Sequence, residues 1–312
     1  MTLASACGKI ILLGEHAVVY GRPALAVPLL QLRAEAAVIT LAEGEAGTVR
    51  LEAPDVYLSS WLHALKSDHP LAKIVHLVRQ ELAIADHPAL ELRLRSSIPV
   101  TSGLGSGTAV SVATVRALSE HWGKPLPVER QSALAFEVEK LHHGTPSGID
   151  NTVVAHEQPV YFRRGEDPQP FPIASPFTLV LGDSGQRSPT SVAVGLVRAG
   201  WQADADRYEG LFNQIAAVVD QGKKAIKQGD LAELGSLMDK NQTLLRNLGV
   251  SSAELEALIE AARRTGALGA KLSGAGMGGN MIALVEDKQA EAAEEALCAA
   301  GAPWTMTAEV GA

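Results

Sequence analysis

Ten residues between two apolar stretches, HHGTPSGIDN at 142–151, combine two histidines, a Gly-Thr-Pro-Ser-Gly turn and an aspartate. Pro146 and the flanking Gly144 and Gly148 end a helix and restrict the backbone that follows, so the side chain of Asp150 is held in a defined direction. An acid held in this way is a candidate for chemistry. A surface turn in which Asp150 caps a helix explains the same residues equally well, so the rest of the chain must decide.

Two glycine-rich loops are candidates for binding phosphate. GLGSG at 103–107 stands between a predicted strand and a predicted helix, where backbone N–H groups and the positive helix end favour anions. It matches neither GxxxxGK(S/T) nor a dinucleotide-binding GxGxxG unit. SGAGMGG at 273–279 lies between two predicted strands, and its glycines let a backbone approach a ligand closely. A tight turn and a flexible hairpin are the alternatives, but two such loops in one chain favour phosphate binding.

Further polar residues lie at the ends of the first predicted strand. Lys9 begins this strand, and Glu15 and His16 follow it directly. Isolated residues of these types are usually solvated or structurally paired, so the three residues alone indicate no function.

The helix predicted near 129–142 ends at the HHGTPSGIDN turn. Its apolar face carries Leu134, Val138 and Leu141. Glu139 and His143, four residues apart, share another face, so we expect the Glu139 carboxylate to point away from the core and towards whatever Asp150 faces. Glu137 lies nearer the apolar face and is the weaker candidate for a metal ligand. A salt-bridged surface is the alternative for both glutamates.

The chain shows an α+β pattern in each half. We expect strands at 9–14, 24–29, 31–41, 48–53, 89–96, 153–162, 178–182, 268–273, 280–285 and 304–310. We expect helices at 70–85, directly after the first glycine loop, at 129–142 and at several places between 189 and 265. Ser251 and Glu254 predict a capping box. The segment 163–176 is rich in proline and charge and is the predicted linker, which gives domains at 1–170 and 171–312.

Composition limits the classes of protein. The chain of 312 residues, with 46% hydrophobic and 20% charged residues, is typical of a globular protein with two domains. A net charge of -8 argues against broad nucleic-acid binding but allows a small anionic ligand. The two cysteines, Cys7 and Cys298, predict neither a disulfide framework nor a zinc site. No apolar run approaches the ~20 residues that cross a bilayer, so we expect no membrane association and a cytoplasmic location.

Four motifs follow one another along the chain: SACGKIILLGEHAVVYG, IPVTSGLGSGTAVS, EKLHHGTPSGIDN and KLSGAGMGGN. Together they resemble the GHMP kinase superfamily, and their length and order make this resemblance far more specific than one glycine loop. The resemblance implies a two-domain α+β fold. Its N-terminal domain resembles ribosomal-protein architecture, its C-terminal domain is ferredoxin-like, and the active site lies between them. ATP, Mg²⁺ and a small-molecule alcohol are the implied ligands. The motifs are compatible with a homodimer and do not fix the oligomeric state.

The resemblance also implies roles for individual residues, which suit a reaction that needs positioning and charge neutralisation. Asp150 is implied to be the catalytic base, and Lys9 to stabilise the alkoxide and the γ-phosphoryl group. Glu139 and Ser106 are the implied magnesium ligands. The implied substrate-binding residues are Glu15, His16, Ser147 and Thr190. The implied ATP-binding residues are Gly103, Leu104, Gly105, Ser106, Gly107 and Thr108, and the C-terminal glycine motif contains Gly274, Ala275, Gly276 and Gly278.

Two residues depart from the superfamily pattern. Cys7 stands where a proline usually precedes Gly-Lys, and Gly107 stands where the loop usually carries a second serine, whose hydroxyl is expected on magnesium. The implied metal site therefore lacks one expected ligand, whereas the implied base is present.

Two other functions are compatible with the same motifs. The first is a related enzyme with an already phosphorylated substrate, which should need extra Lys or Arg residues in the active site. The second is a binding protein that keeps the fold without the chemistry. The presence of both Lys9 and Asp150 favours an enzyme, because a binding protein has no need for this pair.

Overall fold

The computed structural model describes residues 1–99, 103–143 and 146–311, with the side chains of 142 and 143 left out, and it forms two compact units. The first unit contains residues 1–8, the described part of 30–100, and the described part of 104–157. The second contains residues 9–29, 103 and 158–311. None of the helices in the described part of the chain combines the length and hydropathy needed to span a bilayer.

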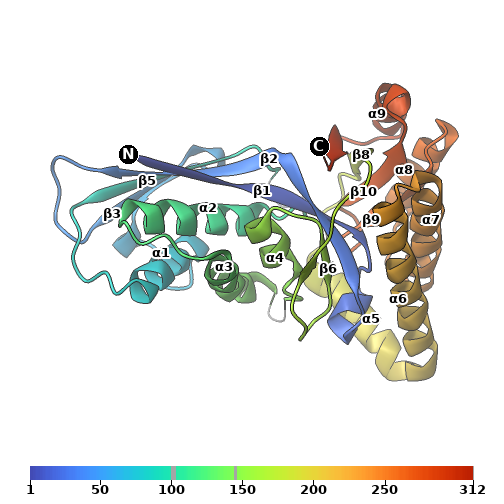
Figure 1. Ribbon diagram of the computed structural model, residues 1–312, viewed down its shortest axis with the longest axis horizontal. Helices are drawn as coiled ribbons and strands as arrows, with labels where there is room; N and C mark the ends of the chain where they lie inside the picture. Colours follow the sequence, from blue (N-terminus) through green and yellow to red (C-terminus); the bar gives the residue numbers. More distant parts are fainter. Residues whose placement is uncertain (100–102, 144–145, 312) are drawn as a thin grey trace. The chain divides into compact units, whose positions relative to one another are not determined.

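The first unit contains one sheet with helices on one of its faces (Figure 1). Its strands follow the order β4 (Leu58–Trp61), β3 (Val49–Ala53), β5 (Leu90–Ser96) and the later part of β2 (Ala24–Thr40). The β3–β5 pair is parallel, whereas β5 pairs antiparallel with β2 from Ala34↔Ser96 to Thr40↔Leu90. The helices are α1 (Pro70–Glu81), α2 (Ser106–His121), α3 (Val128–His143) and α4 (Ile149–His156). Two short 3-10 helices, η2 (Pro54–Val56) and η3 (Leu62–Ala64), flank β4.

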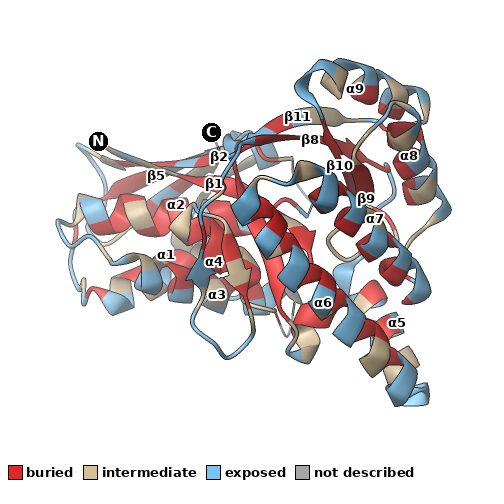
Figure 2. Cartoon of the chain, turned by 45° about the vertical axis from the view of Figure 1, so that its right-hand side comes forward, coloured by how far each residue is buried: buried red, intermediate tan, exposed pale blue. Residues whose placement is uncertain are grey.

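The second unit contains an antiparallel sheet in the order β11 (Thr305–Val310), β8 (Phe177–Asp183), β10 (Asn280–Val285) and β9 (Gly269–Ser273). Its helices are α5 (Thr190–Ala203), α6 (Ala205–Gln228), α7 (Leu231–Asn247), α8 (Ala253–Arg264) and α9 (Ala290–Ala299), with the 3-10 helix η4 (Asp287–Gln289) before α9. Figure 2 shows β8 and β10 buried along their length, whereas the helices expose one side to solvent. The sheet and the inner sides of the helices therefore form the core of this unit.

Two long strands contribute residues to both units. β1 (Thr2–Leu13) pairs with β2, and β2 is continuous where the sequence predicted separate strands at 24–29 and 31–41. Pro28 does not interrupt β2, because it falls between the segment that pairs with β6 (Val160–Phe162) and the segment that pairs with β5. β6 also pairs with the short strand β7 (Gln169–Pro170), and the 3-10 helix η1 (Ala17–Tyr20) connects β1 to β2.

The compact units differ from the predicted division at residue 170. Residues 9–29 belong to the second unit, and the change after the helical part of the first unit falls at Glu157. The reason is packing within the second unit, where a Cβ placed on Gly222 of α6 would lie 2.4 Å from Leu13 and 3.4 Å from Leu25. The division of the chain into domains at 1–170 and 171–312 stays a prediction.

Most predicted strands and helices are confirmed, and two further local predictions are wrong. Residues 153–156 form the end of α4 rather than a strand, because Gly148, in a left-handed conformation, begins a helix whose inner side packs against α2 and α3. The N-cap of α8 is Ser252 rather than Ser251. The Ser252 hydroxyl accepts a hydrogen bond from the N–H of Leu255, whereas Ser251 accepts one from Gln242.

Candidate active site

The first glycine loop leads directly into α2. Gly103 and Gly105 have positive φ angles of 75° and 79°, and Gly105 is the N-cap of the helix. Ser106 is the first residue of α2 and is half-buried, Leu104 is buried, and Gly107 is exposed. The loop therefore presents the N-terminus of a 16-residue helix, where backbone N–H groups lack partners within the helix.

Glu139 of α3 lies next to Thr108 of α2. The Thr108 hydroxyl donates a hydrogen bond of 2.5 Å to the Glu139 carboxylate, and both side chains are buried. Glu139 therefore faces the interior of the unit, in contrast to the predicted orientation. Glu137 also differs from the prediction, since it is exposed and paired with Lys140 at 2.5 Å.

The orientations of Glu137 and Glu139 were predicted wrongly because the buried face of α3 lies at a different position from the predicted apolar face. This face follows Ser132, Ala135 and Glu139 together with Leu134 and Val138, whereas Leu141 is exposed. The helix thus buries a serine and a glutamate in addition to apolar residues, which a count of apolar positions does not detect.

Ser147 and Asp150 lie at the start of α4. Gly148 is the N-cap with a φ of 93°, and the Ser147 hydroxyl accepts a hydrogen bond from the N–H of Ile149 at 3.3 Å. Asp150 is half-buried in the first helical turn, where the helix dipole favours a negative charge. The predicted turn also includes Gly144 and Thr145, which lie outside the described residues.

In the second unit, Glu15 forms an ion pair with Lys271 of β9. Both side chains are almost fully buried, and the Lys271 ammonium also donates a hydrogen bond of 2.5 Å to the carbonyl of Leu272. Burial raises the pKa of Glu15 and lowers the pKa of Lys271, while the attraction between the two charges opposes both shifts. The residue after β1 is thereby tied to the strand that leads into the C-terminal glycine motif.

His16 contacts the same glycine motif. Its Nε2 donates a hydrogen bond of 2.8 Å to the carbonyl of Ala275, which fixes the tautomer because a carbonyl only accepts. The backbone of His16 has a φ of 60°, which is uncommon for a residue other than glycine. Burial lowers the pKa of His16. The structure therefore brings Glu15, His16 and the C-terminal glycine motif together.

The glycines of this motif have different neighbours. A Cβ on Gly276 would lie 2.2 Å from the carbonyl oxygen of Val250, and one on Gly278 would lie 2.6 Å from that of Gln186. Gly274, in contrast, has open space where its Cβ would be. Gly276 and Gly278 are thus required by packing of the loop on its own unit, whereas Gly274 leaves room for a ligand.

Two further predicted residues belong to the second unit. Lys9 is a buried residue of β1. Thr190 is the first residue of α5 and is exposed.

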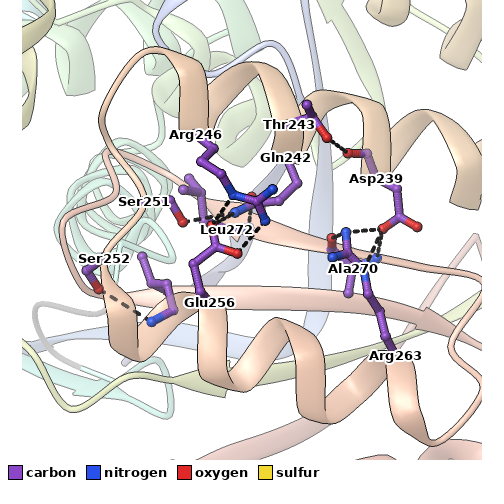
Figure 3. Close-up of polar contacts among 11 residues, drawn as sticks. Asp239, Gln242, Thr243, Arg246, Ser251, Ser252, Glu256, Arg263, Ala270 and Leu272 are labelled. Carbon is purple, nitrogen blue, oxygen red and sulfur yellow. Dashed lines mark hydrogen bonds and ion pairs between the residues drawn. The ribbon is translucent and has the colours of Figure 1, made fainter.

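Lys271 and the residues that hold β9 in place were not predicted. β9 is an edge strand, and two of its N–H groups donate to side chains of α7, from Ala270 to Asp239 at 2.9 Å and from Leu272 to Gln242 at 3.0 Å (Figure 3). Arg263 contacts Asp239, and Arg246 and Gln242 both contact Glu256, which connects α7 to α8. A lysine inside the apolar segment LGAKLS was the available signal for a buried ion pair.

We expect the free energy of unfolding to decrease as the pH falls below 6.5, in part because of His16. The folded-state pKa of His16 lies below its usual value of 6.5, so the unfolded chain binds a proton that the folded chain does not. The variant His16→Gln keeps a donor for Ala275 without titrating. Its slope of unfolding free energy between about pH 6.5 and 5 should be smaller, by at most about 1.4 kcal/mol per pH unit. Urea unfolding at several pH values measures this slope, and equal slopes would contradict the prediction.

Oxygen ligands for magnesium are present in the first unit, although they do not form a preassembled cage. Across residues 1–99, 103–143 and 146–311, no cluster of three or more His, Cys, Asp or Glu side chains is arranged to hold a metal ion. Magnesium usually needs only one or two carboxylates, because waters and nucleotide phosphates supply the remaining oxygens. The buried Glu139 carboxylate beside the Thr108 hydroxyl fits this requirement.

Known proteins share the sequence and the fold of this chain. Residues 70–157 match the family described as GHMP kinases N terminal domain, and residues 223–303 match the family described as GHMP kinases C terminal. The chain is 36% identical to the mevalonate kinase of Pyrococcus horikoshii, over 96% of this chain and 93% of that protein. It is also 36% identical to the mevalonate kinase of Thermococcus gammatolerans, over 96% and 94%. The chain therefore belongs to the GHMP kinase family, which confirms the predicted two-domain α+β fold.

Two solved structures have the same fold. The crystal structure of L. major mevalonate kinase in complex with R-mevalonate matches with a TM-score of 0.85 and 28% identity, over 99% of this chain and 96% of that chain. Streptococcus pneumoniae phosphomevalonate kinase matches with a TM-score of 0.82 at 18% identity, over 98% of this chain and 100% of that chain. Because both enzymes share the fold, the fold alone does not select the substrate.

Proposed function

We propose that this chain is an ATP-dependent mevalonate kinase. It transfers the γ-phosphoryl group of ATP to the primary alcohol of mevalonate and produces 5-phosphomevalonate for isoprenoid synthesis. The observation that carries this proposal is the 36% identity to mevalonate kinases over 96% of the chain. GEHAVVYG at 14–21 and HHGTPSGIDN at 142–151 support it, because these two motifs resemble mevalonate kinase in particular.

In the proposed reaction, Asp150 accepts the proton of the mevalonate alcohol. The Lys9 ammonium lowers the cost of the developing alkoxide and balances the charge of the γ-phosphoryl group. Residues 103–108 bind the phosphates of ATP through the start of α2. This division of roles is supported by the half-buried position of Asp150 at a helix N-terminus and by the amide-rich end of α2.

The substrate side is proposed to include Glu15, His16, Ser147 and Thr190. The contacts of Glu15 with Lys271 and of His16 with Ala275 add a second role to the first two residues, because they hold the C-terminal glycine motif. Substitution of either residue should therefore disturb both the loop and the substrate site.

Magnesium is proposed to be held by Glu139 and the ATP phosphates, and it would neutralise phosphate charge during transfer. The hydroxyl of Ser106 or Thr108, or a water, would replace the serine oxygen that Gly107 lacks. The hydrogen bond from Thr108 to Glu139 supports this proposal, because it places a hydroxyl directly beside the carboxylate.

We expect Glu139→Gln to raise the magnesium concentration needed for half-maximal activity by about tenfold or more, because a neutral amide binds Mg²⁺ poorly. Gly107→Ser should lower this concentration or leave it unchanged. Gly107 lies in α2 without a positive φ, and no atom lies within 4 Å of the position of an added Cβ, so the serine is sterically tolerated. Activity is titrated against free Mg²⁺ at fixed ATP. Glu137→Gln, an exposed glutamate of the same helix, is the matched control, and an unchanged requirement in Glu139→Gln would refute the metal assignment.

The substrate is tested by ADP release in the presence of magnesium ATP and one acceptor at a time. We expect strong stimulation by mevalonate, and little by phosphomevalonate, diphosphomevalonate, galactose or homoserine. A preference for phosphomevalonate would identify a different enzyme of the same family. Binding of mevalonate without ADP release would identify a non-catalytic binding protein.

A further inference from the structure

A charged cluster lies in the first unit at the opposite end of α4 from Asp150. Glu157, the C-cap residue of α4, accepts hydrogen bonds from Arg116 of α2 at 2.6 Å and from Arg33 of β2 at 3.0 Å. The three side chains are between 19% and 33% exposed, so the cluster is largely enclosed. We refer to Arg33, Arg116 and Glu157 as the α4 anchor.

Arg116 connects four elements through one guanidinium group. Its Nε donates to Gln131 of α3 at 2.9 Å, and Nη2 donates to the carbonyl of Ala155 in α4 at 2.7 Å. Nη1 donates to the carbonyl of Ser5 in β1 at 2.7 Å and to Glu157. The bond to Ala155 satisfies a carbonyl in the last turn of α4, which has no partner within the helix. These four hydrogen bonds require the planar guanidinium group of an arginine, because the ammonium group of a lysine cannot donate in all these directions.

The backbone of Glu157 shows that the anchor constrains the end of α4. Its φ of 51° is in the left-handed region, where a glycine is favoured and a glutamate is strained. A strained conformation persists only where surrounding contacts hold it. The contacts of the Glu157 side chain with the two arginines therefore hold a backbone conformation that favours glycine.

The proposed phosphate loop, metal ligand and base lie on the same three helices, away from the α4 anchor. The loop leads into the start of α2, Glu139 lies near the end of α3, and Asp150 lies in the first turn of α4. Asn151 of α4 donates to the Ser132 hydroxyl of α3 at 2.8 Å, and Thr108 of α2 donates to Glu139 of α3. α4 has eight residues, so it is only about 12 Å long. A displacement at its anchored end is thus transmitted to Asp150 in its first turn.

We propose that Arg116, together with Glu157, is a positioning residue for phosphoryl transfer. It fixes the direction of α4 against α2, and with it the position of Asp150 relative to the phosphate loop at the start of α2. This inference rests on the proposed role of Asp150 as base. Loss of these contacts also lowers stability, so the positioning role is judged on the rate of the folded protein. Misplacing a reacting group by about 1 Å can reduce a rate about a hundredfold.

The test compares Arg116→Met, Arg116→Lys, Glu157→Gly and the double variant Arg116→Met/Glu157→Gly. Glu157→Gly removes the carboxylate and relieves the backbone strain, which separates loss of the contact from loss of stability. We expect kcat to fall between about tenfold and a hundredfold in Arg116→Met and Glu157→Gly, with little further loss in the double variant. The KM for ATP should change less than about twofold, because the phosphate loop is untouched. Arg116→Lys should restore only part of the rate.

Two controls separate this proposal from its alternatives. Arg130→Met removes an ion pair with Glu81 at the surface of the same unit, and its kcat should stay at the wild-type value. Asp150→Asn is measured in the same series. If Asp150→Asn is inactive while folded Glu157→Gly and Arg116→Met keep the wild-type kcat, the positioning role is refuted and the base assignment stands. If Asp150→Asn keeps wild-type turnover, the base assignment fails and the positioning role fails with it. A loss of kcat that only follows the folded fraction in a melting curve also refutes the positioning role.

Discussion

Asp150→Asn is expected to reduce kcat by about a hundredfold to ten-thousandfold, which is the usual contribution of a general base. Asparagine has the shape of aspartate but does not accept the proton of the alcohol at neutral pH. ATP binding should stay close to the wild-type value, because the proposed base acts on the alcohol and not on the nucleotide. Single-turnover kinetics at saturating mevalonate measures the chemical step, and calorimetric titration with an ATP analogue measures binding.

Asp206→Asn is the matched control for this experiment. Asp206 lies in the first turn of α6, as Asp150 lies in the first turn of α4, so both substitutions remove a charge from a helix N-terminus. The control variant should keep its turnover. Lys9→Met should resemble Asp150→Asn, since both residues are proposed to act on the alkoxide. Wild-type turnover in Asp150→Asn would show that this carboxylate is not the base.

Lys271→Met is expected to lower the free energy of unfolding by about 3–5 kcal/mol, because it leaves the buried carboxylate of Glu15 without its positively charged partner. Glu15→Gln should also destabilise the protein, since it leaves a buried ammonium. The double variant Glu15→Gln/Lys271→Met should recover part of the loss, because it contains neither isolated charge. Urea unfolding measures all three differences at constant pH.

The exposed pair of Lys140 and Glu137 provides the comparison for this effect. Their side chains are 44% and 46% exposed, against 0% and 1% for Lys271 and Glu15. Lys140→Met should therefore change the unfolding free energy by at most about 1 kcal/mol. Similar losses for Lys271→Met and Lys140→Met would contradict the importance of burial for the Glu15 pair.

The sequence predicted the parts of the site that depend on local patterns. Gly103 and Gly105 adopt the positive φ angles expected of a glycine loop before a helix, and Asp150 follows a turn that Gly148 closes. These features depend on the conformational limits of neighbouring residues, which the sequence displays directly. The α+β fold of two units follows in the same way from strand and helix periodicities.

Features that depend on contacts between distant segments could not be predicted in this way. Lys271 meets Glu15 across 256 positions of the chain, and Glu139 is buried beside Thr108 of a different helix. The amino acids at 153–156 are typical of a strand, but these residues form a helix because α4 packs against α2 and α3. In each case tertiary contacts outweigh the local preference.

The proposed phosphoryl transfer is tested most directly by identifying the product. The purified chain is mixed with magnesium ATP and mevalonate, and phosphorus NMR follows the reaction without decoupling of protons. A new phosphomonoester signal should appear as a triplet, because the phosphate is attached to the oxygen of a CH₂ group, and ADP should form in equal amount. Inorganic phosphate in place of the phosphomonoester, or unchanged ATP with fully folded protein, would contradict the assignment of this chain as a mevalonate kinase.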